Sequence, residues 1–144
     1  MSEMRCVFCK IMSGELDGSF VYRDELVSAF MDIHPLTPGH LLVVPNRHAV
    51  DLYDVDEGTA ARMMQVGRKL GLAMMRSDLG CRAFNFFLAN GKEAGQTVFH
   101  CHLHVIPRYP DDGFGVVFPP GYGRVAAQTE LKQQAALIHQ ALEM

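Results

Sequence analysis

The stretch Val98-Phe99-His100-Cys101-His102-Leu103-His104-Val105-Ile106 places a histidine at every second position of an apolar run. It is rich in β-branched and aromatic residues and lies between Gly95 and Pro107, so it is predicted to be a strand. Side chains of a strand alternate between its two faces. The three histidines are therefore expected on one face, and Phe99, Cys101, Leu103 and Val105 on the other, in a core.

The spacing of the histidines limits what they can do together. Neighbours on one face of a strand are about 7 Å apart and the outer pair about 13 Å. One zinc ion, with Zn–N bonds of about 2 Å, can bind two neighbours but not all three. At least one imidazole is left for other chemistry, and near neutral pH it can act as a nucleophile, acid or base. The simpler interpretation, a polar face of solvated histidines, fits an apolar strand poorly.

Composition excludes several classes of protein. The 144 residues are 49% hydrophobic and 20% charged, which is typical of a single globular domain. A formal net charge of −3 provides no basic field, so a nucleic acid polymer is not an expected partner. The N-terminus leads into no long apolar stretch, so neither a signal peptide nor a membrane partner is expected. Four cysteines fit a cytoplasmic protein better than a disulfide scaffold.

The remaining pattern predicts an α+β domain, with a mostly antiparallel sheet, one main helix and a C-terminal helix. The main helix is expected from about 56 to 77, where apolar residues recur at three- and four-residue steps. The C-terminal helix is expected at about 126–142. Residues 1–144 are expected to form one domain, with 109–144 as a variable C-terminal segment. A helical turn is expected at 6–11, and further strands at 20–22, 26–31, 40–45 and 84–89, the first two as a hairpin.

The pair Cys6-x-x-Cys9 is a candidate metal site. No βαβ pattern surrounds it, which argues against a thioredoxin-like redox pair. A tetrahedral zinc site needs two more ligands. His48 ends a predicted strand and His100 begins one, so both could converge on the cysteines in a closed structural site. The alternative is a pair of buried thiols.

The turn before the histidines is a candidate phosphate site. Asn90, Gln96 and Thr97 surround glycines in this turn, and exposed backbone N–H groups of such turns bind anions. The Asn amide and Thr hydroxyl could add donors and hold a phosphate against His102. The alternative is an ordinary turn.

Two residues outside the histidine run are candidates for supporting roles. Asp32 ends a predicted strand and could accept hydrogen bonds from ribose hydroxyls. Its alternative role is to cap the following turn. His40 begins a buried strand, where a histidine is normally hydrogen-bonded, and it could hold another histidine in its working tautomer.

Together these residues resemble the histidine triad (HIT) superfamily of nucleotide hydrolases and transferases. The likeness extends over residues 5 to 108, and Pro107-Arg108 resembles the bacterial Hit-like and dinucleoside-hydrolase branches. The segments that carry it are Cys6-x-x-Cys9, Asp32-Ile33, Pro38-Gly39-His40-x-Leu42-Val43-x-Pro45-x-Arg47-His48 and Gly95-Gln96-Thr97-Val98-x-His100-x-His102-x-His104-Val105.

The resemblance implies a role for each matching residue. His102 would attack the α-phosphate and form a nucleotidyl-histidine, which water then cleaves. His40 would belong to the imidazole relay that orients His102, and Asp32 would bind the ribose. The phosphate would be contacted by His104 and Thr97, with Asn90 and Gln96 nearby. Structural zinc would be bound by Cys6, Cys9, His48 and His100, and no catalytic cofactor would be required.

The function implied is cleavage of purine nucleoside phosphoramidates or similar nucleotidyl adducts by a cytoplasmic enzyme. Three alternatives remain open: a dinucleoside polyphosphate hydrolase, a zinc-stabilised nucleotide-binding protein with little turnover, and a metalloenzyme with the triad as catalytic ligands. A homodimer is expected, because the methionine-rich helix is apolar over more than one face and the sheet leaves an edge to cover. Many members of the family pair through this helix and a neighbouring strand.

Overall fold

A computed structural model describes residues 3–142. The chain divides into two compact units after Phe114. The first unit contains the sheet and every residue of the histidine run, and the second contains the C-terminal helix. Each unit is described by itself.

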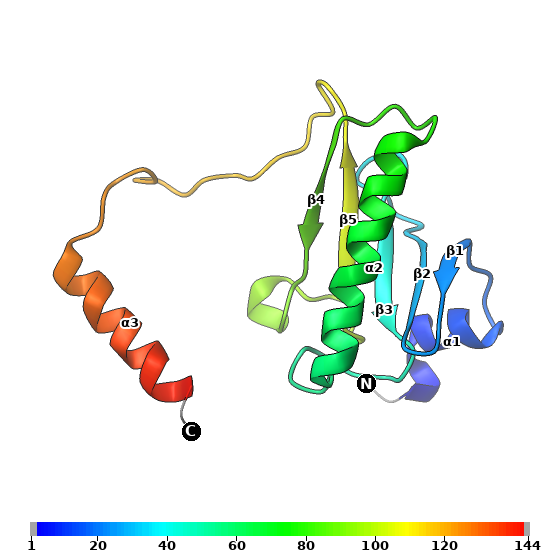
Figure 1. The fold of residues 1–144 in the computed structure, drawn as a ribbon, viewed down its shortest axis with the longest axis horizontal. Helices are drawn as coiled ribbons and strands as arrows, with labels where there is room; N and C mark the ends of the chain where they lie inside the picture. The colour runs from blue at the N-terminus through cyan, green and yellow to red at the C-terminus, as the bar shows by residue number, and fades with distance from the viewer. Residues whose placement is uncertain (1–2, 143–144) are drawn as a thin grey trace. The chain divides into compact units, whose positions relative to one another are not determined.

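The first unit is built on one five-stranded sheet with the order β1-β2-β3-β5-β4 (Figure 1). Every neighbouring pair is antiparallel, so the predicted α+β fold is confirmed. β1 and β2 form the predicted hairpin, whose turn is closed by Asp24 Oδ1 accepting from Val27 N at 2.9 Å. The strands are β1 (Phe20–Arg23), β2 (Val27–Met31), β3 (Leu41–Pro45), β4 (Ala83–Phe87) and β5 (Leu103–Arg108).

The prediction of one strand over 98–106 is wrong for its first half, because β5 begins only at Leu103. A strand needs a neighbour, and the pairing of β5 with β3 starts at Val43↔Leu103. Before that point the backbone bonds to loops instead, as when Cys101 N donates to Ala49 O at 2.7 Å. The alternation of faces partly survives: Cys101, Leu103 and Val105 are in the core, whereas Phe99 is only half-buried.

The main helix α2 (Glu57–Arg76) crosses one face of the sheet, as Figure 1 shows. Asp56 caps it by accepting from Thr59 N at 2.7 Å, which confirms the predicted start. The helix lies close to the sheet at Gly71, where an added Cβ would come within 2.5 Å of the Phe84 ring. The core between α2 and the sheet is formed by side chains on one face of β2, β3 and β5 and by side chains of the helix. The strand residues are Val27, Ala29, Leu41, Val43, Leu103 and Val105, and the helix residues are Met63, Val66 and Met74.

The short helix α1 (Val7–Ser13) packs against the opposite face of the sheet. Phe8 and Ile11 of this helix contact Phe30, Leu42 and Val44, which alternate with the strand residues that face α2. His104 pairs with Leu42 in the register of β3 and β5, so its side chain lies on the α1 face. Two 3-10 turns, η1 (Glu3–Arg5) and η2 (Lys92–Ala94), flank this region.

The second unit contains α3 (Gln128–Leu142), within two residues of the predicted helix. None of the residues of α3 is buried. Large apolar residues of this unit, such as Val117 and Ile138, are strongly exposed. Among the helices that the structure describes, none combines the length and apolar character needed to cross a membrane.

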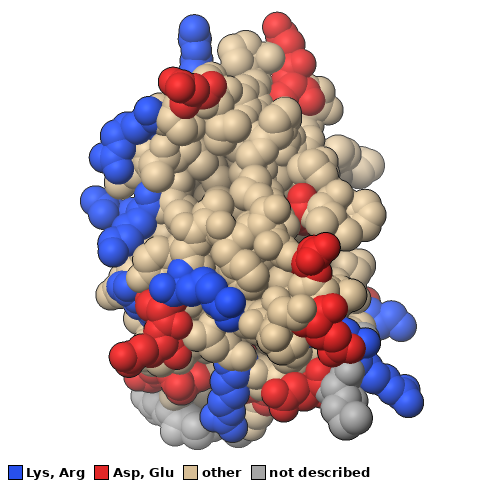
Figure 2. Space-filling model, turned by 90° about the vertical axis from the view of Figure 1, so that its right-hand side faces the viewer, with Lys and Arg blue, Asp and Glu red and all other residues tan. Residues whose placement is uncertain are grey.

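Charges are unevenly spread over the face drawn in Figure 2, which is turned toward the side of β1 and α1 in Figure 1. Lysine and arginine side chains lie mostly along one long edge, and acidic side chains lie along the other edge and at both ends. Uncharged residues form the middle of the face. The net charge of −3 is therefore not concentrated in one patch there.

Candidate active site and metal centre

A cavity of about 340 Å³ opens on the α1 face of the sheet. This is the lower part of the range for small-molecule sites. Its polar side chains come from three separate segments: Asp32 and His34 after β2, Thr97 in the loop before β5, and His102 and His104, which lie just before β5 and within it. Most of the remaining lining is apolar: Val7, Phe8, Ile11, Phe30, Met31, Ile33, Leu42 and Val98.

His102 is buried and lines this cavity. Its Nδ1 lies 2.7 Å from the carbonyl oxygen of His100, which can only accept, so Nδ1 carries the proton. The other nitrogen, Nε2, keeps its lone pair. Burial lowers the pKa of His102 below its usual value, so the imidazole is neutral at pH 7. A neutral imidazole with an available Nε2 lone pair is a nucleophile.

His104 is held by a chain of hydrogen bonds that fixes its tautomer. Leu36 N donates to His40 Nδ1 at 3.0 Å, so the proton of His40 is on Nε2. His40 Nε2 then donates to His104 Nδ1 at 2.8 Å, which leaves the proton of His104 on its own Nε2. Burial lowers the pKa of both residues, that of His104 to about 4. The neutral His104 can therefore donate a hydrogen bond from Nε2.

Asp32 caps the turn that follows β2 and also lines the cavity. Oδ1 accepts from His34 N at 2.8 Å and so caps the turn. Oδ2 lies 3.5 Å from His40 Nε2, and the residue lines the cavity. The second oxygen is placed where a ligand hydroxyl could reach it.

The predicted phosphate-binding turn is only partly at the cavity. Thr97 lines the cavity and is exposed. Gln96 is buried, and its amide group makes three hydrogen bonds of 2.6 to 3.1 Å to backbone groups. Asn90 accepts from Leu52 N at 2.7 Å. Neither Gln96 nor Asn90 lines the described cavity. In this geometry both residues hold the loop that carries Thr97.

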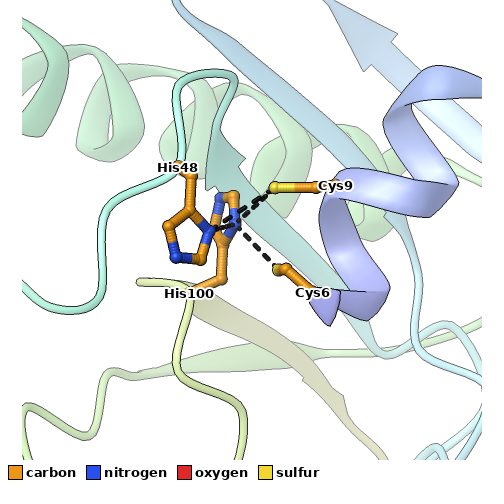
Figure 3. A group of neighbouring side chains, drawn as sticks. All are labelled: Cys6, Cys9, His48 and His100. Atoms are coloured by element: carbon orange, nitrogen blue, oxygen red, sulfur yellow. Dashed lines mark hydrogen bonds between the residues drawn. The ribbon is translucent and has the colours of Figure 1, made fainter. Parts of the chain in front are cut away.

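Cys6, Cys9, His48 and His100 lie close together, as Figure 3 shows. One donor atom from each residue lies within 4.8 Å of the others. Cys6 caps α1 and Cys9 lies within it, His48 follows β3, and His100 precedes β5. The sequence thus identified a group of four side chains that the fold does bring together.

The distances between the donor atoms fit a tetrahedral zinc site. The two His Nδ1 atoms are 3.2 Å apart, and three S–N distances are 3.3, 3.5 and 3.6 Å. Zn–N bonds of about 2.05 Å and Zn–S bonds of about 2.3 Å give edges of about 3.3 to 3.8 Å in a tetrahedron. His100 Nε2 donates to the carbonyl of Pro45 at 2.8 Å, which leaves Nδ1 unprotonated for a metal.

The protonation of the cluster explains why it suits a cation. Burial lowers the pKa of His100 to about 4, so its imidazole is in the neutral, metal-binding form. Burial and the neighbouring Cys6 raise the pKa of Cys9 to about 12, so without a cation its thiol keeps its proton. Zn²⁺ supplies the positive charge that favours the thiolate.

The apolar wall was missed from the sequence. Phe8 and Ile11 belong to a helix that was predicted only as a short turn, and Phe30 to a strand with no assigned role. A local signal existed, since Phe8 and Ile11 are three residues apart and share one helix side. The cavity that they line depends on packing across the sheet, which no local pattern contains.

Comparison with known proteins gives a consistent result. A model of the HIT domain matches residues 13–111. An uncharacterised HIT-like protein of Borreliella burgdorferi is 46% identical over 111 residues, which cover 76% of this chain and 80% of that protein.

Solved structures resemble the whole fold. A HIT family protein from Bacillus anthracis superposes with a TM-score of 0.85 at 38% identity, over 95% of this chain and 96% of that one. A zinc-bound histidine triad family protein from Mycobacterium smegmatis gives 0.75 at 37%, over 99% and 100%. A histidine triad nucleotide-binding protein from Candida albicans gives 0.82 at 26%, over 96% and 97%.

Proposed function

Because the chain belongs to the HIT family, we propose that it is a nucleotidyl hydrolase or transferase acting on purine nucleoside phosphoramidates or similar adducts. One observation carries this proposal: the state of His102. Its buried imidazole is neutral, its Nδ1 donates a hydrogen bond to the carbonyl oxygen of His100, and the residue lines the cavity. A similar chain from Candida albicans is described as nucleotide-binding. The two chemical steps of this proposal are assigned to His102 and the atoms around it.

In the first step, His102 Nε2 attacks the α-phosphorus. The P–Nε2 bond forms as the bond to the leaving group breaks, and the departing amine takes a proton from the solvent. The ring then carries a positive charge, which the carbonyl of His100 stabilises through the Nδ1 proton. In the second step a water oxygen attacks phosphorus, the P–Nε2 bond breaks, and the water loses a proton. The products are a nucleoside monophosphate and free His102.

The surrounding groups stabilise the phosphate and bind the nucleoside. His104 Nε2 and the Thr97 hydroxyl donate to non-bridging oxygens, where charge develops. Asp32 Oδ2 accepts from the ribose hydroxyls. The base packs against the apolar wall around Phe8 and Phe30. Such a wall favours a large aromatic base, but it does not distinguish bases by the hydrogen-bonding groups on their edges.

We also propose that Cys6, Cys9, His48 and His100 bind one structural zinc ion. The tetrahedral donor distances support this, and the zinc-bound relative from Mycobacterium smegmatis is consistent with it. The metal stabilises the fold, and no step at phosphorus is assigned to it. A catalytic cofactor is not required by the chemistry above. A cytoplasmic location and a single domain over 1–144 stay predictions.

The test of this function is turnover of adenosine 5′-phosphoramidate by the intact protein. His102→Ala is expected to lower kcat by several powers of ten, as loss of a covalent nucleophile does in other enzymes. Tyr53→Ala, a change at a side chain that is 94% exposed and does not line the described cavity, is the control and is expected to leave kcat unchanged. Turnover of His102→Ala within about tenfold of the parent protein contradicts the assignment. Competition with a diadenosine polyphosphate then identifies the preferred substrate class.

A further inference from the structure

We propose that the metal ion at Cys6, Cys9, His48 and His100 controls nucleotide binding by holding α1 in place as the wall of the cavity. In this account Phe8 is a positioning residue for His102. The inference rests on the proposed function, because it assumes that the cavity binds a nucleotide. It extends that function by making nucleotide affinity dependent on metal occupancy.

One seven-residue helix serves both sites. Cys6 at the N-cap of α1 and Cys9 within the helix belong to the metal cluster. Phe8 and Ile11 of the same helix line the cavity. The members of each pair are three residues apart, so each pair occupies its own side of the helix. α1 and its N-cap therefore carry both a part of the metal cluster (Figure 3) and a part of the cavity wall.

A helix of this length depends on its attachments. Isolated helices shorter than about 12 residues are marginal in water, so α1 must be stabilised by the rest of the domain. At its C-terminal end Arg23 Nη2 donates to Met12 O at 3.0 Å. Phe8 and Ile11 pack on the sheet, and the polar attachment at the N-terminal end is the cluster with His48 and His100. Without a metal ion this attachment consists of thiol–imidazole contacts, and a thiol is only a weak hydrogen-bond donor.

Phe8 links the metal cluster to the nucleophile. Its buried ring lies 5.1 Å from the His102 ring at an interplanar angle of 80°, an edge-to-face contact. The same ring lies 5.8 Å from that of His100, a member of the cluster. Phe8 also sits between the two cysteines in the sequence, so a movement of the cysteines moves its ring.

Two of the described contacts of the His102 ring thus involve a member of the cluster or its neighbour on α1, whereas a third is with the His104 ring at 4.8 Å. The carbonyl that fixes the Nδ1 proton belongs to His100, and the ring that packs against the imidazole belongs to Phe8. His100 is further held by the hydrogen bond from its Nε2 to Pro45 O, at 2.8 Å. Loss of the metal is therefore expected to weaken nucleotide binding and to misplace the nucleophile while the sheet persists.

The experiment compares the full-length zinc-bound protein with the protein after chelation of zinc. Adenosine monophosphate is the probe, and calorimetry gives its Kd. Without zinc, we expect the Kd to rise by at least about tenfold, equivalent to about 1.4 kcal/mol. Hydrogen exchange should show that the amides of α1 lose protection while those of β2, β3 and β5 keep it. An unchanged Kd in the metal-free protein with an intact sheet overturns the proposal.

Variants test the positioning role of Phe8 even if the metal-free protein unfolds. Phe8→Ala is expected to keep one zinc per chain, to raise the Kd for adenosine monophosphate and to lower kcat, because the His102 ring loses its neighbour. Phe8→Leu keeps the apolar wall and should restore the Kd more fully than kcat. Phe20→Ala is the matched control, because Phe20 packs on Phe30 at 5.7 Å but does not line the cavity.

The outcomes separate this inference from the proposed function. If Phe8→Ala leaves both the Kd and kcat at the values of the Phe20→Ala control, the positioning role is wrong. If the zinc-bound parent neither binds adenosine monophosphate nor cleaves the phosphoramidate, the proposed function itself fails. If the parent does both and zinc removal changes neither Kd nor α1 exchange, only the coupling fails.

Discussion

Hydrogen-bond donors and acceptors assign a proton to one nitrogen in each of His40, His102 and His104. The carbonyl of His100 fixes the Nδ1 proton of His102, and Leu36 N fixes the proton of His40 on Nε2. His104 consequently keeps its proton on Nε2. His102 is thereby a hydrogen-bond acceptor at Nε2 and His104 a donor at Nε2, although the two side chains have the same chemical structure. The backbone, and not the histidine spacing, creates this difference.

The pKa of His104 predicts a dependence of stability on pH. Burial lowers that pKa from 6.5 to about 4, so between these values the unfolded chain binds a proton that the folded chain does not. The contribution of His104 to the free energy of unfolding is therefore complete above about pH 6.5 and declines as the pH falls toward about 4.

Denaturant unfolding at a series of pH values checks this. His104→Gln removes the titrating group, so its stability should fall less steeply than that of the parent between about pH 6.5 and 4. Protonation of the metal cluster affects both proteins equally, so the difference in slope reports on His104 and on the His40 and His102 imidazoles that contact it. Equal slopes for the two proteins would show that His104 is not kept neutral by folding.

At the scale of elements, local signals predicted what local interactions determine. The main helix was expected at about 56–77 and is found at Glu57–Arg76, because its cap and its three- and four-residue periodicity are both local. The strand over 98–106 was half wrong, because its length depends on how far β3 pairs with it, and that pairing stops at Val43↔Leu103 although β3 itself continues. β3 stops at Pro45, whose carbonyl is used by His100 Nε2.

The residues of the candidate site also divide into those that local patterns identify and those whose contacts depend on tertiary packing. The four members of the metal cluster and the histidines of the cavity could be named from spacing and from the resemblance to a family. Gln96 and Asn90 were assigned to the phosphate, and their side chains instead bind the backbone of the loop. Whether an amide faces a ligand or its own loop depends on tertiary packing, which spacing does not contain.

α2 lies so close to the sheet at Gly71 that adding one methyl group there should change the stability of the protein. Gly71→Ala adds a Cβ about 2.5 Å from the Phe84 ring, and overpacking of this kind costs about 1 to 3 kcal/mol. This opposes the gain of about 1 kcal/mol that alanine brings to a helix. Thermal or denaturant unfolding should therefore show no stabilisation, and a net loss where the ring cannot move.

Gly58→Ala is the matched control in the same helix. Its added Cβ meets Asp56 Oδ1 at 3.5 Å, an ordinary contact, so the helix preference of alanine should dominate and raise stability. A Gly71→Ala protein that gains as much stability as Gly58→Ala would contradict the packing of α2 against β4.

At the scale of the whole molecule, we predict a homodimer that forms through α2 and β4. β4 is an edge strand, and Phe87 on it is 52% exposed. Met64 and Met75 of α2 are 53% and 43% exposed, more apolar surface than one helix on a sheet needs to leave open. A two-fold contact would cover both features on each chain.

Sedimentation at micromolar concentration checks this assembly. The parent should sediment at twice the monomer mass of 16.0 kDa, and Phe87→Glu should shift the species toward the monomer. Val21→Glu makes the same change on the opposite edge strand, β1, and should leave the dimer intact. A fully active parent protein at the monomer mass would refute the dimer.

The central claim is that His102 forms a covalent bond to the nucleotide, and intact-mass spectrometry after rapid mixing tests it most directly. With adenosine 5′-phosphoramidate, the zinc-bound protein should gain the mass of one adenylate, and fragmentation should place that mass on His102. The adduct should disappear as turnover ends and should be absent from His102→Ala. Turnover by the parent protein without any adduct during the rapid phase, or with an adduct on another residue, would contradict the account.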